Sequence, residues 1–270
     1  ARNAFKGPTS KPDDKATDRG FAGSNTTERQ RVMDALVGAF PDEREPGRGI
    51  NYLDIHDNWT LADQFATRDW NGLAGVDEAE YRIAAGLLFT SLGPVVIHGG
   101  SEVLRSKGSA QIEYDTRYET GNPIYFKGRG DTYNVRKPNL FLWDTIGRTD
   151  GPDDIAAMEA WWKGLIALRN SPMGTPLRIA DTPPADYVRW FAPDDAPGLL
   201  GYQIDERLMV AMNTSDTPAS LIVDAAPGNW RLVADGTRAG TTPLDGPRLT
   251  GGTQTLVLPP LTLMIWTRSE

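Results

Sequence analysis

Apolar residues recur at helical spacing in three segments, 25–40, 77–93 and 153–170, and predict a helix in each. Asn25 precedes the first segment, and its short polar side chain can accept a hydrogen bond from the free amides at a helix start. Pro94 follows the second segment, and proline cannot continue a helix. These signals predict where the helices begin and end.

Two short apolar segments, 50–55 and 95–100, lie between these helices and predict strands. Strands buried on both faces of a parallel sheet have this nearly continuous apolar composition. Strands that alternate with helices predict an α/β fold for residues 1–175. Two parallel strands alone would leave unpaired backbone groups at both edges, so we expect this part to belong to a larger α/β domain.

The pattern changes after residue 175. Short β-rich segments follow one another, separated by turn residues such as Asp235-Gly236. They read YVRWF, LLGYQI, LMVAMN, SLIVD, WRLVAD, QTLVL and LTLMIW. This spacing predicts an antiparallel β-sandwich over residues 176–270.

Composition excludes several classes of function. The formal net charge is −8, which argues against a nucleic-acid partner because phosphate binding favours a basic face. No apolar segment approaches the roughly 20 residues of a membrane span. The chain has no cysteine, so disulfides and thiolate metal sites are excluded. It opens on Ala1-Arg2-Asn3, which we expect to be the inside of a longer polypeptide.

His56, Asp57 and Asn58 directly follow the first predicted strand. In parallel α/β barrels the carboxyl ends of the strands carry the active site, so this cluster is the main candidate for chemistry. The alternative is a structural carboxylate that caps the loop, beside a histidine satisfied by hydrogen bonds. After the second strand, we expect His98 to be packed and Glu102 to anchor its loop.

The loop over about 100–152 lacks periodicity, and a loop of this length in a compact domain is usually functional. Its aromatic residues alternate with hydrogen-bonding groups, a combination that suits the apolar face and the hydroxyl rim of a sugar. The alternative is that single aromatics only hold the loop in place. The aromatic residues are Tyr114, Tyr118, Tyr125, Phe126, Tyr133, Phe141 and Trp143.

Several motifs together resemble a known family. INYLDIHDNWTLADQF, VVIHGGSEVLRSKG, YNVRKPNLFLW and WWKGLIALRNS are similar to the last part of type I pullulanases, the α-1,6-debranching members of the α-amylase clan. LMVAMNTSD and LPPLTLMIW resemble the C-terminal β-sandwich of that family. The resemblance implies that residues 1–175 are the last quarter of a (β/α)8 barrel, its last two strands and their helices.

The same resemblance implies the roles of the site residues. Asp57 matches the third carboxylate of the family, which stabilises the oxocarbenium-like transition state. His56 and Asn58 would contact the glucan, and Tyr133 and Asn134 would shape the substrate groove. The nucleophile and the general acid would lie in the N-terminal remainder of the same enzyme. One departure is Ser101, which stands where the family usually has glutamine.

The implied function is hydrolysis of α-1,6-glucosidic branch links in pullulan, starch or glycogen, with retention of configuration. No cofactor is required; calcium is frequent in the clan, but no loop here has a dense set of oxygen ligands. Another clan activity, such as isoamylase or branching enzyme, and a non-catalytic glucan-binding module stay open as alternatives. Both secretion and a cytoplasmic location fit this function.

Overall fold

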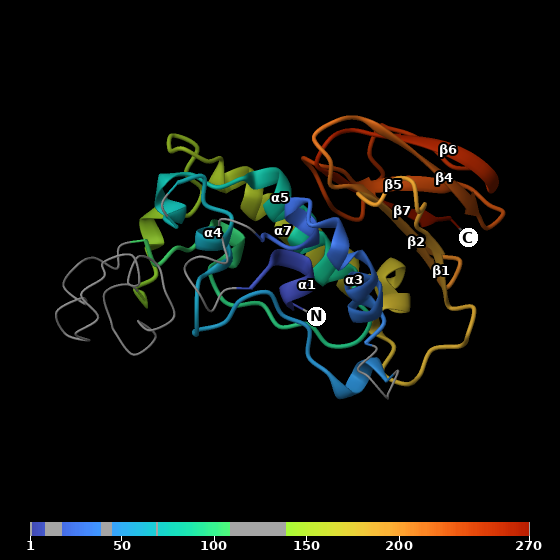
Figure 1. Ribbon diagram of the computed structural model, residues 1–270, viewed down its shortest axis with the longest axis horizontal. Coiled ribbons are helices and arrows are strands. Elements are labelled where there is room, and N and C mark those ends of the chain that lie inside the picture. Colours follow the sequence, from blue (N-terminus) through green and yellow to red (C-terminus); the bar gives the residue numbers. More distant parts are fainter. Residues whose placement is uncertain (1, 9–17, 39–44, 69, 109–138, 270) are drawn as a thin grey trace.

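The computed structural model describes residues 2–8, 18–38, 45–68, 70–108 and 139–269. Helices occupy the middle of the molecule, and the strands gather at one end together with the C-terminus (Figure 1). The helices are α1 (Arg2–Lys6), α3 (Arg29–Leu36), α4 (Leu61–Gln64), α5 (Glu78–Thr90) and α7 (Ile155–Asn170). Short 3-10 helices cover Phe21–Gly23, Thr26–Glu28, Pro46–Arg48, Gly72–Ala74, Ser101–Val103, Trp143–Thr145 and Pro172–Arg178.

Side-chain caps begin the predicted helices. Asn25 accepts from the amide of Thr27, Asp77 caps α5 and Asp154 caps α7. The first helix is shorter than predicted: α3 ends at Leu36 and not at Phe40. Gly38 has a φ of 68°, which a helix cannot contain. None of the helices in the described residues is both long and apolar enough to cross a membrane.

The two segments predicted as parallel strands lie side by side, but neither is a regular strand. They meet at one isolated parallel bridge between Asn51 and Val95, where the amide of Val96 donates to the Asn51 oxygen at 2.8 Å. The prediction of strands over 50–55 and 95–100 is therefore wrong in extent. A strand is maintained by a ladder of bonds to its neighbours, and in the described residues these segments share only this short contact.

All seven β-rich segments form strands, and every pairing between them is antiparallel, as predicted. The larger sheet has the order β1-β2-β3-β7-β5, and β4 and β6 form a separate pair. The strands are β1 (Val188–Phe191), β2 (Leu199–Ile204), β3 (Leu208–Asn213), β4 (Ala219–Ala225), β5 (Trp230–Ala234), β6 (Gly252–Leu258) and β7 (Thr262–Arg268).

The larger sheet is covered on both faces. Strand β3 shows this best, because all of its residues are buried. Met209 and Ala211 pack toward β4 and β6, whereas Val210 and Met212 pack toward the helices. Successive side chains of a strand point to opposite faces, so two separate apolar cores meet across β3. Trp230 and Trp266 fill the core between the two sheets.

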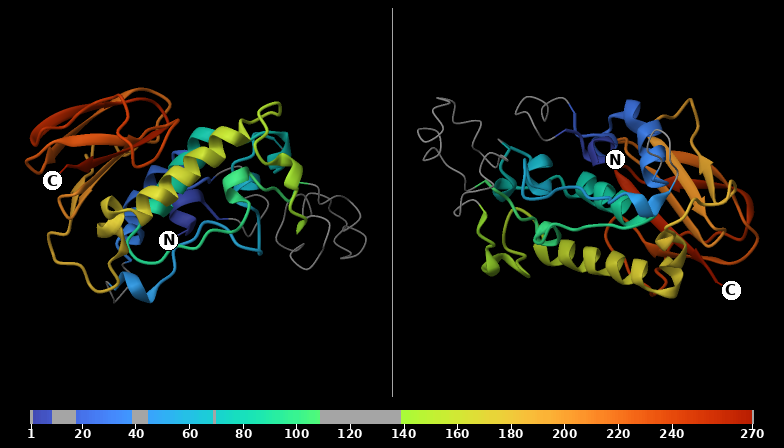
Figure 2. Two further views of the ribbon diagram at one scale, coloured as in Figure 1. Left: turned by 180° about the vertical axis from the view of Figure 1, so that it is seen from behind. Right: turned by 90° about the horizontal axis from the view of Figure 1, so that it is seen from below.

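Helix α7 lies alongside α5 and joins the helices to the sheet (Figure 2). Trp162 packs edge-on against Phe89 of α5, with ring centroids 5.3 Å apart. Its neighbour Trp161 donates a hydrogen bond to the main-chain oxygen of Asp235, just after β5, at 2.9 Å. The apolar core on this side therefore contains residues from both halves of the chain, and the division into domains 1–175 and 176–270 stays a prediction.

Arg169 holds the end of α5 against α7. Its buried guanidinium donates to the main-chain oxygens of Phe89, at 2.6 Å, and Ser91, at 2.8 Å. These oxygens belong to the last turn of α5 and the residue after it, where carbonyls have no intrahelical partner. Burial, together with the nearby charge of Arg178, lowers the pKa of Arg169 to about 10.

Candidate functional site

The polar cluster lies on an exposed turn after the first apolar segment. The side chain of His56 is 62% exposed and that of Asp57 is 52% exposed, and His56 Nε2 lies 3.4 Å from Asp57 Oδ1. Asn58 continues the turn with a left-handed φ of 62°. Trp59 follows, wholly buried and stacked on Trp70 with ring centroids 4.7 Å apart. The turn thus presents an imidazole and a carboxylate to solvent from a backbone anchored by a buried aromatic ring.

A buried lysine lies beneath this turn. Lys107 is wholly buried, and its Nζ donates to the main-chain oxygens of His56, at 2.6 Å, and Asn58, at 3.0 Å. The pKa of Lys107 is lowered to about 8, chiefly by burial and also by the charge of Arg105, although the charges of Asp63, Asp54 and Asp57 oppose the fall. The two carbonyls on either side of Asp57 are therefore joined to one ammonium group.

The backbone around Lys107 is itself held by Asp63, a wholly buried residue of α4. Asp63 Oδ2 accepts from the amide of Lys107 at 2.9 Å and from the hydroxyl of Thr60 at 2.7 Å. Its other oxygen accepts from the amide of Gly72 at 3.1 Å and from the hydroxyl of Ser106. Burial raises the pKa of the Asp63 carboxyl, while these four hydrogen bonds oppose the rise. Asp63 thus connects α4 to the segment that carries Lys107.

A second buried carboxylate, Asp54, joins the ends of the two apolar segments. It accepts from the amide of Leu61 and from the hydroxyl of Ser101, both at 2.9 Å, and lies 3.7 Å from Nδ1 of His98. Ser101, the departure from the family pattern, thus has a defined partner. Glu102 accepts from the amide of Gly100 at 2.9 Å, which agrees with the predicted anchoring role.

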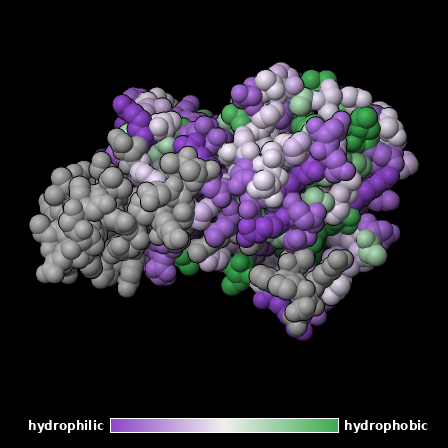
Figure 3. Space-filling view, in the orientation of Figure 1, coloured by the Kyte–Doolittle hydropathy of each residue, from purple (hydrophilic) through white to green (hydrophobic). Residues whose placement is uncertain are grey.

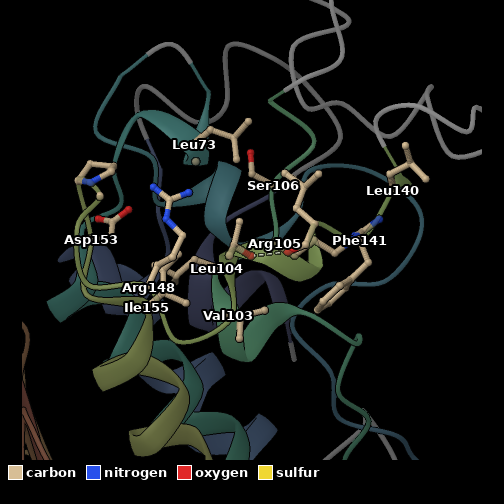
Figure 4. Close-up of a pocket in the computed structure, with 15 residues that line it drawn as sticks. Leu73, Val103, Leu104, Arg105, Ser106, Leu140, Phe141, Arg148, Asp153 and Ile155 are labelled. Carbon is tan, nitrogen blue, oxygen red and sulfur yellow. Dashed lines mark hydrogen bonds between the residues drawn. The ribbon is translucent and has the colours of Figure 1, made fainter.

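An open cavity lies beside the segment from Val103 to Ser106. Figure 4 shows Leu104, Arg105 and Ser106 in the middle of its wall, with Arg148 and Asp153 to one side and Phe141 to the other. Arg105 Nη2 donates to the side-chain oxygen of Asn139 at 3.1 Å. The segment from Val103 to Lys107 therefore has one side on the cavity and connects through Lys107 to the exposed turn.

The predicted site residues have different outcomes. His56, Asp57 and Asn58 lie together on the exposed turn, whereas Tyr133 and Asn134 lie outside the described residues. Of the predicted sugar-binding aromatics, Phe141 lines the cavity. Trp143 is 75% exposed, and its ring centroid lies 4.6 Å from that of Phe141.

Three buried groups that support the turn were not predicted from the sequence: Asp54, Asp63 and Lys107. A signal for Asp63 was present, because Thr60 stands three residues before it, the spacing of a side-chain cap with a reciprocal partner. Lys107 had no such signal, because its partners lie about fifty residues earlier in the chain. Charged residues are rarely fully buried, so sequence alone assigns a lysine to the surface.

Across the part of the chain that the structure describes, there is no group of three or more histidine, aspartate or glutamate residues that could hold a metal ion.

On the face seen in Figure 3, the described surface is mostly hydrophilic, with apolar residues in separate small patches.

Known proteins resemble this chain in sequence over part of its length. No protein-family model matches it. A pullulanase of Bacillus subtilis (strain 168) is 33% identical over 123 residues, which cover 43% of this chain and 16% of that protein. A pullulanase of Klebsiella aerogenes is 28% identical over 144 residues, covering 47% of this chain and 12% of that protein. The chain is similar to part of the pullulanases.

Solved structures show the same likeness in the fold. The GBS pullulanase SAP in complex with maltotetraose superimposes with a TM-score of 0.71 and 20% identity, covering 100% of this chain and 38% of that one. The type I pullulanase of Bacillus subtilis str. 168, in complex with maltose, has a TM-score of 0.65 and 21% identity, covering 99% of this chain and 34% of that one. The resemblance to pullulanases seen in the motifs is therefore confirmed, and this chain spans less than a fifth of the curated pullulanases.

Proposed function

We propose that this chain is part of a pullulanase-type hydrolase that cleaves α-1,6-glucosidic links in pullulan, starch or glycogen. In this proposal residues 1–175 are the last quarter of a (β/α)8 barrel and residues 176–270 a β-sandwich. Asn51 and Val95 form a parallel bridge, and α5 lies between them in the chain. This order of parallel segment, helix and parallel segment supports the barrel assignment. The similarity to pullulanases, some of them in complexes with maltooligosaccharides, supports the substrate class.

Asp57 carries the proposed role in catalysis. A carboxylate held beside a sugar ring stabilises the positive charge that develops there in the transition state. The observation that supports this role is the exposure of Asp57 beside His56 on a turn whose main chain is bound by a buried cation. His56 and Asn58 would contact sugar hydroxyls, and Tyr133 and Asn134 are proposed to help shape the substrate groove.

The nucleophile and the general acid are proposed to come from the remainder of the same enzyme, outside these 270 residues. A retaining pair of carboxyl groups lies about 5–5.5 Å apart across the scissile bond. Glu102 follows the second apolar segment, but its carboxylate accepts from the amide of Gly100 within its own loop. This engagement favours an anchoring role for Glu102 over a reactive one.

The test is Asp57→Asn in the complete enzyme, assayed on pullulan. Turnover should fall by at least about 100-fold, because the neutral amide cannot stabilise the developing charge. Asp216→Asn, at an exposed position in the turn after β3, is the matched control and should retain normal turnover. Near-normal turnover of Asp57→Asn would overturn the assignment. Incubation with pullulan and with linear amylose tests the bond, because a debranching enzyme prefers pullulan.

A further inference from the structure

The turn that carries Asp57 has no regular secondary structure of its own. Its residues belong to no helix or strand, and Asn58 has a left-handed backbone conformation that costs a non-glycine residue about 1 kcal/mol. Such a turn keeps one conformation only if its surroundings determine it. The contacts of the turn identify the group that determines its conformation.

Lys107 contacts the turn on both sides of Asp57. One Nζ donates to the oxygen of the residue before Asp57 and to the oxygen of the residue after it. Because a single nitrogen makes both bonds, it fixes the distance between the two carbonyls and with it the orientation of the peptide units that flank Asp57. The Asn58 bond also stabilises the left-handed residue directly.

The segment that carries Lys107 is itself held in place by Asp63. Asp63 accepts from the main-chain amide of Lys107, and the hydroxyl of Ser106 donates to the other oxygen of the same carboxylate. Asp63 belongs to α4, which follows the turn after Trp59 and Thr60. The turn, α4 and the Lys107 segment therefore form a closed set of contacts in which Lys107 is the member that reaches the turn.

Burying a lysine for a purely structural contact costs free energy. An ammonium group loses its hydration when it is buried, and an apolar residue of similar volume often gives equal or greater stability. Among the described residues, the buried ammonium donates to the two main-chain oxygens around Asp57 and to no carboxylate. The placement therefore favours a role in shaping this turn over a role in general stability.

We propose that Lys107 is a positioning residue for the Asp57 carboxylate, holding the turn from His56 to Asn58 in the one conformation in which Asp57 faces the substrate. This inference rests on the proposed function of Asp57. Lys107 acts through the turn and does not itself touch the sugar. Its removal should lower turnover and leave the affinity for glucan nearly unchanged.

The test is Lys107→Met in the complete enzyme, with Lys163→Met as the matched control. Lys163 is an exposed lysine of α7 that pairs with Glu159 at 2.6 Å, so its loss should not affect turnover. For Lys107→Met, kcat on pullulan should fall roughly 10- to 100-fold, because small misplacements of a catalytic group have effects of this size. KM should stay within about twofold, since binding outside the turn is retained.

Two further measurements distinguish a role of Lys107 in positioning Asp57 from a role in the overall stability of the protein. Amide hydrogen exchange of residues 56–59 should rise at least about tenfold in Lys107→Met, while that of α7 should not change. In the double variant with Asp57→Asn, Lys107→Met should cause much less further loss of kcat than it does alone, because most of its effect on kcat passes through Asp57. If Lys107→Met does not fold, Lys107→Gln is measured by the same criteria.

The outcomes distinguish the two proposals. If Asp57→Asn keeps normal turnover, the proposed function fails and this inference fails with it. If Asp57→Asn loses turnover but Lys107→Met keeps kcat within twofold of Lys163→Met, only the positioning role is overturned. Additive losses in the double variant, or unchanged exchange at residues 56–59, would also overturn it.

Discussion

The ammonium nitrogen of Lys107 lies 2.6 Å from the main-chain oxygen of His56, although 51 residues separate the two in the chain. This bond joins the segment that lines the open cavity to the exposed turn that presents Asp57. The turn is therefore supported by tertiary contacts and not by its own sequence. Its stability should depend on the charge state of one buried amine.

The first prediction concerns pH. Burial lowers the pKa of Lys107 from its ordinary 10.5 to about 8. Between these two values the unfolded chain binds a proton that the folded chain has released, so the free energy of unfolding should rise with pH across this window. The full rise corresponds to at most about 3 kcal/mol.

Urea unfolding at several pH values between 7.5 and 9.5 measures this effect. The pH range ends at 9.5 because two other buried groups affect the free energy of unfolding at higher pH. Burial raises the pKa of Tyr187 to about 12 and lowers that of Arg169 to about 10. Lys107→Met should lack the rise that Lys163→Met retains. Equal pH dependence in the two variants would contradict the assigned burial of the Lys107 charge.

The second prediction concerns the contact between α7 and the turn after β5. A Cβ added at Gly164 would lie 2.0 Å from the main-chain oxygen of Ala239, and backbone cannot easily move aside. Gly164→Ala should therefore lower the free energy of unfolding by about 2 kcal/mol, although alanine normally favours a helix.

Two other glycines are matched controls for this effect. At Gly86 in α5 the added Cβ would meet the flexible side chain of Leu263 at 2.6 Å, so Gly86→Ala should cost less than Gly164→Ala. At Gly99 no atom lies within 4 Å, and Gly99→Ala should change stability by no more than about 0.5 kcal/mol. Urea unfolding of the three variants checks the order, and a neutral Gly164→Ala would show that the contact is not tight.

The third prediction concerns a buried hydrogen bond between α5 and β2. The oxygens of Thr90 and Tyr202 lie 2.6 Å apart, and Thr90 donates its own proton to the Gly86 oxygen, so the Tyr202 hydroxyl donates to Thr90. Tyr202→Phe should cost about 1 kcal/mol of stability. Thr90→Val should cost more, because it leaves the buried tyrosine hydroxyl without an acceptor.

A double-mutant cycle tests this pair. The double variant should be less destabilised than the sum of the two single variants, because each removes the same bond. Thermal or urea unfolding of the four proteins gives the coupling energy. Additive effects would mean that the two hydroxyl groups do not interact in solution.

Much of the fold could be predicted from local signals. The caps at Asn25, Asp77 and Asp154 and the helical spacing behind them act within a few residues, so the starts of three helices were predictable. The seven strands followed from short β-rich segments between turns for the same reason. The two apolar segments near Asn51 and Val95 were predicted as longer strands than they are, because a ladder needs neighbours that lie elsewhere.

By itself, the sequence determined where three helices begin and where the seven strands lie, that these strands pair antiparallel, and that a histidine and a carboxylate share one turn. Only the tertiary structure decided what supports that turn, since Lys107 and Asp63 are charged and would be assigned to the surface from sequence alone. It also decided that β3 is buried on both faces, between the helices and the second sheet. The physical reason is that periodicity and capping depend on neighbours in the chain, whereas burial of a charge depends on partners brought together by folding.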